Sequence, residues 1–194
     1  MRKLTVDDIV DHRAYERDRD EFRRHIIEIK RRRRIAVGDF VTVVFENTDT
    51  MRFQVQEMAR AERMLTDEAI AHEVETYNEL IPGPDELSAT LFVELTDDAL
   101  LREWLPKLRG IEFALRFELG DGRSHVIGIP SDEERLTRDD ITSTVHYLKF
   151  PFAAHQRAQL AFGPARLVVD HREYQASVEL DEAQRSELAH DFER

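Results

Sequence analysis

The chain has 194 residues, of which 35% are charged and 41% hydrophobic, and its formal net charge is −12. This length suits one domain with a sizeable core, and this composition is typical of a globular protein with a heavily charged surface. The acidic balance disfavours nucleic acid as a partner, because a phosphate backbone selects for a basic surface. The absence of cysteine excludes disulfides, cysteine-ligated zinc and an iron–sulfur cluster held by this chain alone.

The sequence also disfavours a membrane or secretory location. No apolar run approaches the roughly 20 residues that span a bilayer, and the first residues lack the apolar core of a signal peptide. We therefore expect a cytoplasmic protein that does not enter a membrane.

The first long helix is predicted over residues 14–30, where apolar side chains recur on one side. It ends in the basic run Lys30–Arg34, which includes Arg31, Arg32 and Arg33. In one interpretation this run binds phosphate or an acidic partner. In the other, its cations are solvated and complement the negative end of the helix dipole.

Two short strands, over residues 35–37 and 40–45, precede a predicted central helix, Met51–Leu65. Apolar side chains fall on two sides of this helix, so we expect it to be covered on both. Glu62 falls in the middle of the main apolar stripe, and Glu57 lies beside the smaller one. Buried carboxylates are costly unless they are paired, protonated or bound to a metal. Arg60 lies three residues after Glu57, so an ion pair within the helix can satisfy Glu57.

A further helix after Thr66 runs towards Pro82-Gly83-Pro84, which stops it. Beyond this point the pattern changes to alternating apolar and polar residues, the period of half-buried strands, interrupted by short helices and by a charged turn or short helix around residues 131–140. The predicted fold class is α+β, with a largely antiparallel sheet in the C-terminal half packed against an N-terminal helical part. We expect one domain over residues 1–194, helix-rich over 1–82, strand-rich over 85–180, with a polar C-terminal helix over 181–194.

Histidines on the apolar sides of the predicted strands are the first candidates for chemistry. His146 and His171, and in its own strand His125, alternate with apolar residues. Such imidazoles are either satisfied core groups or ligands. If the strands are neighbours, His146, His171 and Glu62 form the two-histidine, one-carboxylate set of non-haem iron sites, with Glu57 in reserve. The cofactor would then be a divalent transition metal such as iron.

A second candidate site is cationic. Arg60 and Arg63 near the end of the central helix, together with Arg31, Arg32 and Arg33, are candidates for binding a partner or an anion. This pattern keeps an RNA- or anion-binding module open as a weaker alternative.

Several stretches together resemble a bacterial family of unknown function. They are Gln54–Arg63, Tyr77–Pro82 with Leu87–Thr90, Val145–Phe150, and Asp170-His171 with Tyr174. Members of that family are often encoded beside rubrerythrin-like proteins and iron–sulfur oxidoreductases. The resemblance implies a link to oxidative stress or iron redox chemistry, and it implies that the C-terminal helix extends beyond the family's usual end.

The leading hypothesis is an accessory protein that works through a protein partner, such as a rubrerythrin-like or iron–sulfur protein. The alternative is a metalloprotein, which includes a non-haem iron enzyme. Whether the protein is an enzyme stays open, as does self-association into a homo-oligomer.

Overall fold

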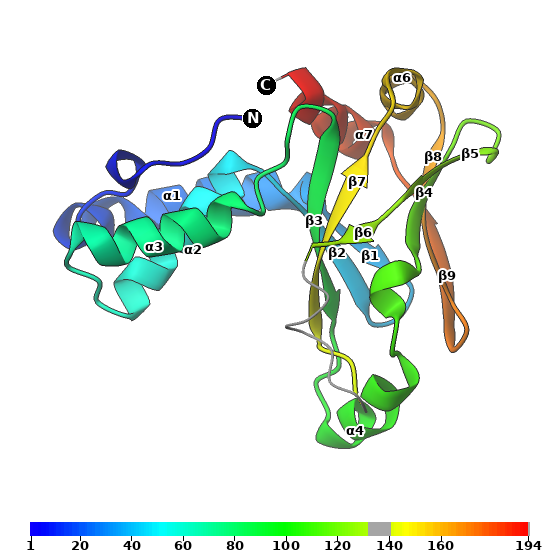
Figure 1. Ribbon diagram of the computed structural model, residues 1–194, viewed down its shortest axis with the longest axis horizontal. Coiled ribbons are helices and arrows are strands. Elements are labelled where there is room, and N and C mark those ends of the chain that lie inside the picture. The colour runs from blue at the N-terminus through cyan, green and yellow to red at the C-terminus, as the bar shows by residue number, and fades with distance from the viewer. Residues whose placement is uncertain (132–140, 194) are drawn as a thin grey trace.

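The computed structural model describes residues 1–131 and 141–193, and its central feature is a pair of antiparallel β-sheets packed face to face (Figure 1). Sheet A has the strand order β1-β2-β3-β7-β6, and sheet B has the order β5-β4-β8-β9. The strands of sheet A are β1 (Arg34–Val37), β2 (Val41–Glu46), β3 (Glu86–Val93), β7 (Val145–Pro151) and β6 (Ile129–Pro130). Those of sheet B are β5 (Ser124–Ile127), β4 (Leu115–Leu119), β8 (Ala165–His171) and β9 (Tyr174–Glu179).

The main core lies between the two sheets, because alternate residues of each strand point inward. Phe117 of sheet B packs with its ring centroid 5.5 Å from Phe45 and 5.2 Å from Phe150, both of sheet A. Short helices cover the ends of this sandwich: α4 (Asp98–Lys107), η2 (Ile111–Phe113), α6 (Ala154–Phe162), α7 (Glu182–Ala189) and η3 (His190–Glu193).

A helical arm projects from the sandwich on the side of sheet A (Figure 1). It consists of residues 1–33 and 48–82, with η1 (Val6–Asp8), α1 (His12–Arg33), α2 (Thr48–Ala61) and α3 (Asp67–Asn78). A second, smaller apolar cluster holds the arm together and includes Met51, Val55 and Ile81, with Tyr147 of β7 packed against it. All six residues of β2 are buried, since the sandwich core covers one side of this strand and the arm covers the other.

The α+β class is confirmed, and the predicted elements lie close to their observed places. The sheets are antiparallel and most of their strands follow residue 85, as predicted, while β1 and β2 add two strands from the N-terminal part to one side of sheet A. The segment predicted as a charged turn or short helix lies, from residue 132 to 140, outside the described residues.

The β1–β2 hairpin is fixed at its turn by Tyr174 of β9. Its hydroxyl donates to the carbonyl of Val37 at 2.7 Å. Gly38 has a φ of +78°, and a Cβ added there would lie 2.3 Å from the Tyr174 hydroxyl. Glycine is therefore required at this turn both for its conformation and for the close approach of the ring.

The opposite end of this hairpin joins the arm to the sandwich. Arg34 pairs with Val44 in the antiparallel register, so the end of α1 and the start of α2 lie next to each other. At the start of α2, Asn47 and Thr50 form a capping box: each backbone N–H donates to the other side chain at 2.9 Å.

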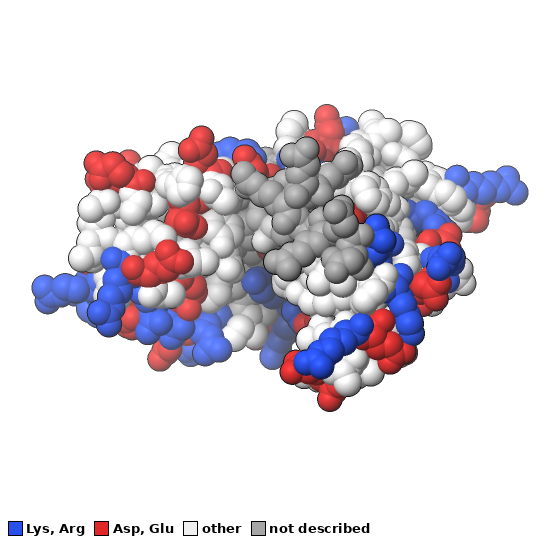
Figure 2. All heavy atoms as spheres, turned by 60° about the horizontal axis from the view of Figure 1, so that its bottom comes forward, with Lys and Arg blue, Asp and Glu red and all other residues white. Residues whose placement is uncertain are grey.

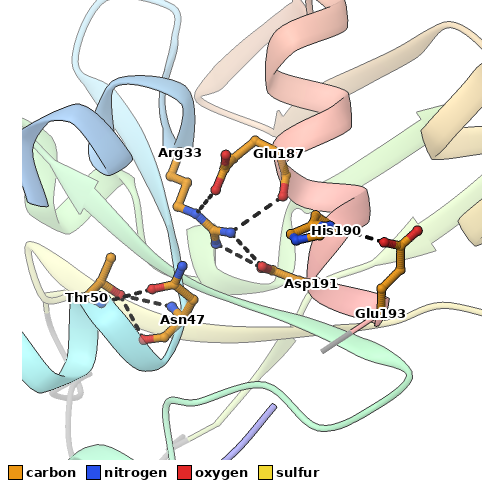
Figure 3. A network of polar contacts seen from close by, with 7 residues as sticks. All are labelled: Arg33, Asn47, Thr50, Glu187, His190, Asp191 and Glu193. Carbon is orange, nitrogen blue, oxygen red and sulfur yellow. Dashed lines mark hydrogen bonds and ion pairs between the residues drawn. The ribbon is translucent and has the colours of Figure 1, made fainter. Parts of the chain in front are cut away.

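Beside this cap, Arg33 at the end of α1 forms a buried ion cluster with the C-terminal helices (Figure 3). Its guanidinium binds Asp191 through two hydrogen bonds, at 2.8 and 2.5 Å, and its Nε donates to Glu187 at 2.9 Å. The side chains of Arg33 and Asp191 are both completely buried. The prediction of Arg33 as part of a surface site is therefore wrong. The C-terminal helix, predicted as merely polar, supplies the carboxylates of this cluster.

Within the described residues, no helix has both the length and the apolarity to cross a bilayer.

Replacing Arg33 by Met should lower the free energy of unfolding by about 3–5 kcal/mol, because Asp191 would keep a buried charge without its guanidinium. Urea unfolding measures this loss. Arg32→Ala changes an exposed neighbour and should stay within about 0.5 kcal/mol of the wild type. The double variant Arg33→Met/Asp191→Leu should recover part of the loss. A loss below about 1 kcal/mol for Arg33→Met would show that the cluster does not anchor the arm.

Candidate functional site

Glu62 does not occupy the buried position that the sequence predicted. Helix α2 ends at Ala61, four residues before the predicted end, and Glu62 is an exposed residue at its C-cap. The chain then leaves the helix, so the apolar stripe does not continue through Glu62, and Leu65 is 82% exposed. The argument for a buried carboxylate at this position is thus removed.

The helix ends in a Schellman turn, in which Arg63 takes the position that usually belongs to glycine. The N–H of Met64 donates to the carbonyl of Ala59 at 2.9 Å, and that of Arg63 donates to Arg60 at 3.4 Å. Arg63 has a φ of +53° and is the non-glycine residue with positive φ among those described. A side chain in this conformation costs about 1 kcal/mol relative to an ordinary helical residue.

Glu57 is held by the neighbouring helix α1 rather than by its own helix. The Tyr15 hydroxyl donates to it at 2.6 Å, and Arg19 donates twice, at 2.8 and 2.7 Å. The Arg19 hydrogen bonds lower the pKa of Glu57 to about 2, against the opposing effect of burial. The intrahelical ion pair with Arg60 that the spacing suggested is not what holds Glu57: Arg60 donates to Glu16 at 2.5 Å, and only its charge acts on Glu57.

His146 lies in the core, as its alternation predicted. Its Nε2 is 3.0 Å from the carbonyl of Ser143 and 3.1 Å from the Thr142 hydroxyl. A carbonyl only accepts, so the hydrogen-bond pattern assigns the proton to Nε2. Nδ1 faces the carboxylate of Glu112 at 4.0 Å. Burial lowers the pKa of His146, while the Glu112 charge and the Ser143 carbonyl act in the opposite direction.

His171 and His125 are bound to backbone atoms elsewhere in the fold. His171 lies at the end of β8, where its Nε2 contacts the carbonyl of Arg109 at 2.9 Å and its Nδ1 accepts the N–H of Glu173 at 3.2 Å. His125 is exposed, since the face it shares with Ile127 is the outer face of sheet B.

The structure therefore does not bring Glu62, His146 and His171 together. Glu62 lies on the arm, His146 lies on sheet A, and His171 lies on sheet B. In the described part of the chain no group of three His, Cys, Asp or Glu side chains is placed to hold a metal ion.

The predicted cationic residues fall into two groups at opposite ends of α1. Arg31 and Arg32 are exposed near Arg33, at the end of the helix that joins the sandwich. Arg60 and Arg63 lie near the start of α1. At 1.5 Å per residue, this end of the helix is about 27 Å from the end that carries Arg31 and Arg32. The five arginines therefore do not form one site.

Arg60 and Arg63 instead lie with three residues of α1 around an open hollow at the end of the arm, here called the tip depression. It has a volume of about 650 Å³. Its lining residues are His12, Arg13, Glu16, Arg60, Ala61, Arg63 and Leu65. Figure 2 shows Lys and Arg side chains gathered along one side of the arm, at the lower left of the view.

The tip depression is cationic even though it contains a carboxylate. Glu16 is shared by Arg60 and, at 3.9 Å, by His12. Among the ion pairs of the described residues, none involves Arg13 or Arg63. Sequence reasoning missed His12 and Arg13 because they lie almost fifty residues before their partners and carry no local motif.

Comparison with known proteins places the chain in a family. The family model described as "Protein of unknown function (DUF3501)" matches residues 3–192. The chain belongs to this family. Since the match includes α7 and most of η3, the expectation that the C-terminal helix extends beyond the family's usual end is wrong.

A crystal structure of a protein of unknown function from Burkholderia pseudomallei K96243 is similar to this chain. It has 30% sequence identity and a TM-score of 0.90, over 98% of this chain and 99% of that one. The family fold thus includes both the arm and the sandwich. Comparison with curated proteins gave no match.

Glu57 should make the stability of the protein depend on pH in the acidic range. Its folded pKa of about 2 lies below the ordinary value of 4.5, so its contribution is present above pH 4.5 and is lost as the pH falls from 4.5 towards 2. In urea unfolding across this window, Glu57→Gln should weaken the pH dependence seen in the wild type. Glu62→Gln, at an exposed site near the same helix, is the matched control. Equal slopes for Glu57→Gln and the wild type would refute the assignment.

His146 should titrate below 6.5, the ordinary pKa of histidine, because its burial disfavours the charged ring. Unfolding releases this constraint, so the contribution of His146 to stability falls as the pH drops below 6.5. Nitrogen-15 NMR of the ring, followed through a pH titration, should show the Nε2–H form and a midpoint below 6.5. An Nδ1–H form would contradict the hydrogen-bond assignment.

Proposed function

We propose that this protein is an accessory protein that acts by binding a protein partner through its helical arm. The observation that carries the proposal is the tip depression. It combines three arginines and a histidine with an exposed leucine, at the end of an element that projects from the sandwich. Arginine is enriched in protein interfaces, where it binds carboxylates through its planar fork of donors.

The attachment of the arm supports this role. The Arg33 cluster and the packing against the outer face of sheet A fix the base of the arm. A rigid element positions binding groups more reliably than a free loop does, and it limits the conformational entropy lost on binding.

The proposed partner is an iron or redox protein. This choice comes from the gene neighbourhood of rubrerythrin-like and iron–sulfur oxidoreductase proteins that the resemblance implies. The cationic tip of the arm calls for an acidic surface on that partner, because complementary charges steer the docking of proteins.

The tagged full-length chain, isolated from its native cells, should co-purify with an iron or redox protein. The complex should form again from the two purified proteins, as measured by size-exclusion chromatography with light scattering. Because charged surfaces guide the association, raising the salt concentration should weaken it. The tag alone, carried through the same isolation, is the control. Recovery of the chain only by itself, as a monomer or with its own copies, would refute the proposal.

A further inference from the structure

We infer that the tip depression receives an acidic segment of a protein partner, one in which carboxylates alternate with an apolar side chain. This inference rests on the proposed function and names the docking element that the arm recognises. It follows from the charges of the depression, from the backbone conformation at Arg63 and from the exposed side chain of Leu65.

The free positive charge of the depression comes from Arg13 and Arg63. Arg60 binds Glu16, and both side chains are about two-fifths exposed or less. Arg13 and Arg63 face the same hollow, and no ion pair among the described residues includes either of them. The charge of Arg13 also acts on the nearby carboxylate of Asp11, the N-cap of α1, without a direct ion pair. A hollow with two guanidinium groups outside any direct ion pair of the described residues favours a ligand with two or more carboxylates.

The backbone conformation of Arg63 also supports binding at the tip depression. Glycine fits the left-handed position of a Schellman turn without strain, yet this chain has arginine there with a φ of +53°. No hydrogen bond from the Arg63 guanidinium to another described residue compensates for this conformation. The arginine is therefore better explained by what it binds than by how it folds.

Leu65 decides the class of ligand. It is 82% exposed and lines the same hollow as the two arginines. A single exposed leucine is ordinary, but one that lines the same hollow as two arginines outside any direct ion pair among the described residues offers apolar contact to a bound chain. A peptide with acidic and apolar side chains can use both kinds of group, whereas a simple oxyanion uses only the charges.

The size and the total charge favour a protein segment over the other anions. A hollow of about 650 Å³ is much larger than a single phosphate or sulfate. The net charge of −12 repels a long polyanion such as RNA along most of the surface. A short acidic segment meets only the tip of the arm, where the charge is positive.

The test measures binding of a fluorescent peptide of Glu-Glu-Leu repeats to the full-length protein by anisotropy. The variant Arg13→Ala/Arg63→Gly should weaken binding by about tenfold or more. The control variant Arg123→Ala/Arg172→Ala removes the same charge from exposed hairpin positions of the sandwich, and should stay within about twofold of the wild type. Leu65→Ser should abolish the preference for Glu-Glu-Leu over Glu-Glu-Ser repeats.

Folding does not confuse this test, because glycine suits the Schellman position and Arg63→Gly should melt no lower than the wild type. Equal weakening by the arginine variant and the control would overturn the inference. Tighter binding of a single-stranded RNA of matched charge, or displacement of the peptide by inorganic phosphate at equal concentration, would also overturn it. If the native partner binds the wild type and Arg13→Ala/Arg63→Gly equally, this inference fails while the proposed function stands. If no partner is found, the proposed function fails and the peptide result still decides the chemistry of the depression.

Discussion

The buried cluster of Arg33, Asp191 and Glu187 is the interaction on which the arrangement of the two halves depends. It joins the last residue of α1 to the C-terminal helices at the point where the chain enters β1. Taking a guanidinium and a carboxylate out of water is costly, and the attraction compensates only when the geometry is good. The two hydrogen bonds between Arg33 and Asp191 meet this condition. The cluster therefore has one well-defined arrangement, and it fixes the direction in which α1 leaves the sandwich.

The rest of the architecture follows from that direction. Since β1 and β2 are an antiparallel hairpin, the chain returns to the arm beside the place where it left, and the capping box of Asn47 and Thr50 starts α2 there. The arm then covers the outer face of sheet A, which explains why β2 is buried on both sides. It also explains buried polar groups on that face, such as the Thr90 hydroxyl, which donates to Glu46 at 2.8 Å. The tip depression lies at the end of the arm farthest from this anchor.

The elements were predictable from the sequence because helix and strand periods are local properties, and His146 was correctly assigned to the core for the same reason. The contacts of the site residues could not be predicted, since their partners are distant in the chain. Arg33 lies 158 residues before Asp191, and Glu57 lies 38 residues after Arg19. Glu62 was misplaced for a local reason: the helix stops at a turn that normally contains glycine, and Arg63 gives no such signal. A continuous stripe was therefore extended through a residue that lies outside the helix.

Arg33 and Arg63 show opposite uses of the same side chain. Arg33 is buried and forms ion pairs with two carboxylates, so its charge is compensated within the fold. Arg63 is exposed, forms no ion pair among the described residues and is in a conformation that favours glycine. A residue that does not suit its local backbone conformation, and that stabilises nothing in the folded chain, is expected at functional positions. In this acidic protein, such a cation in the same hollow as Arg13 and the exposed Leu65 is the basis of the binding surface proposed above. This contrast is the physical reason to test the tip of the arm as the proposed binding surface.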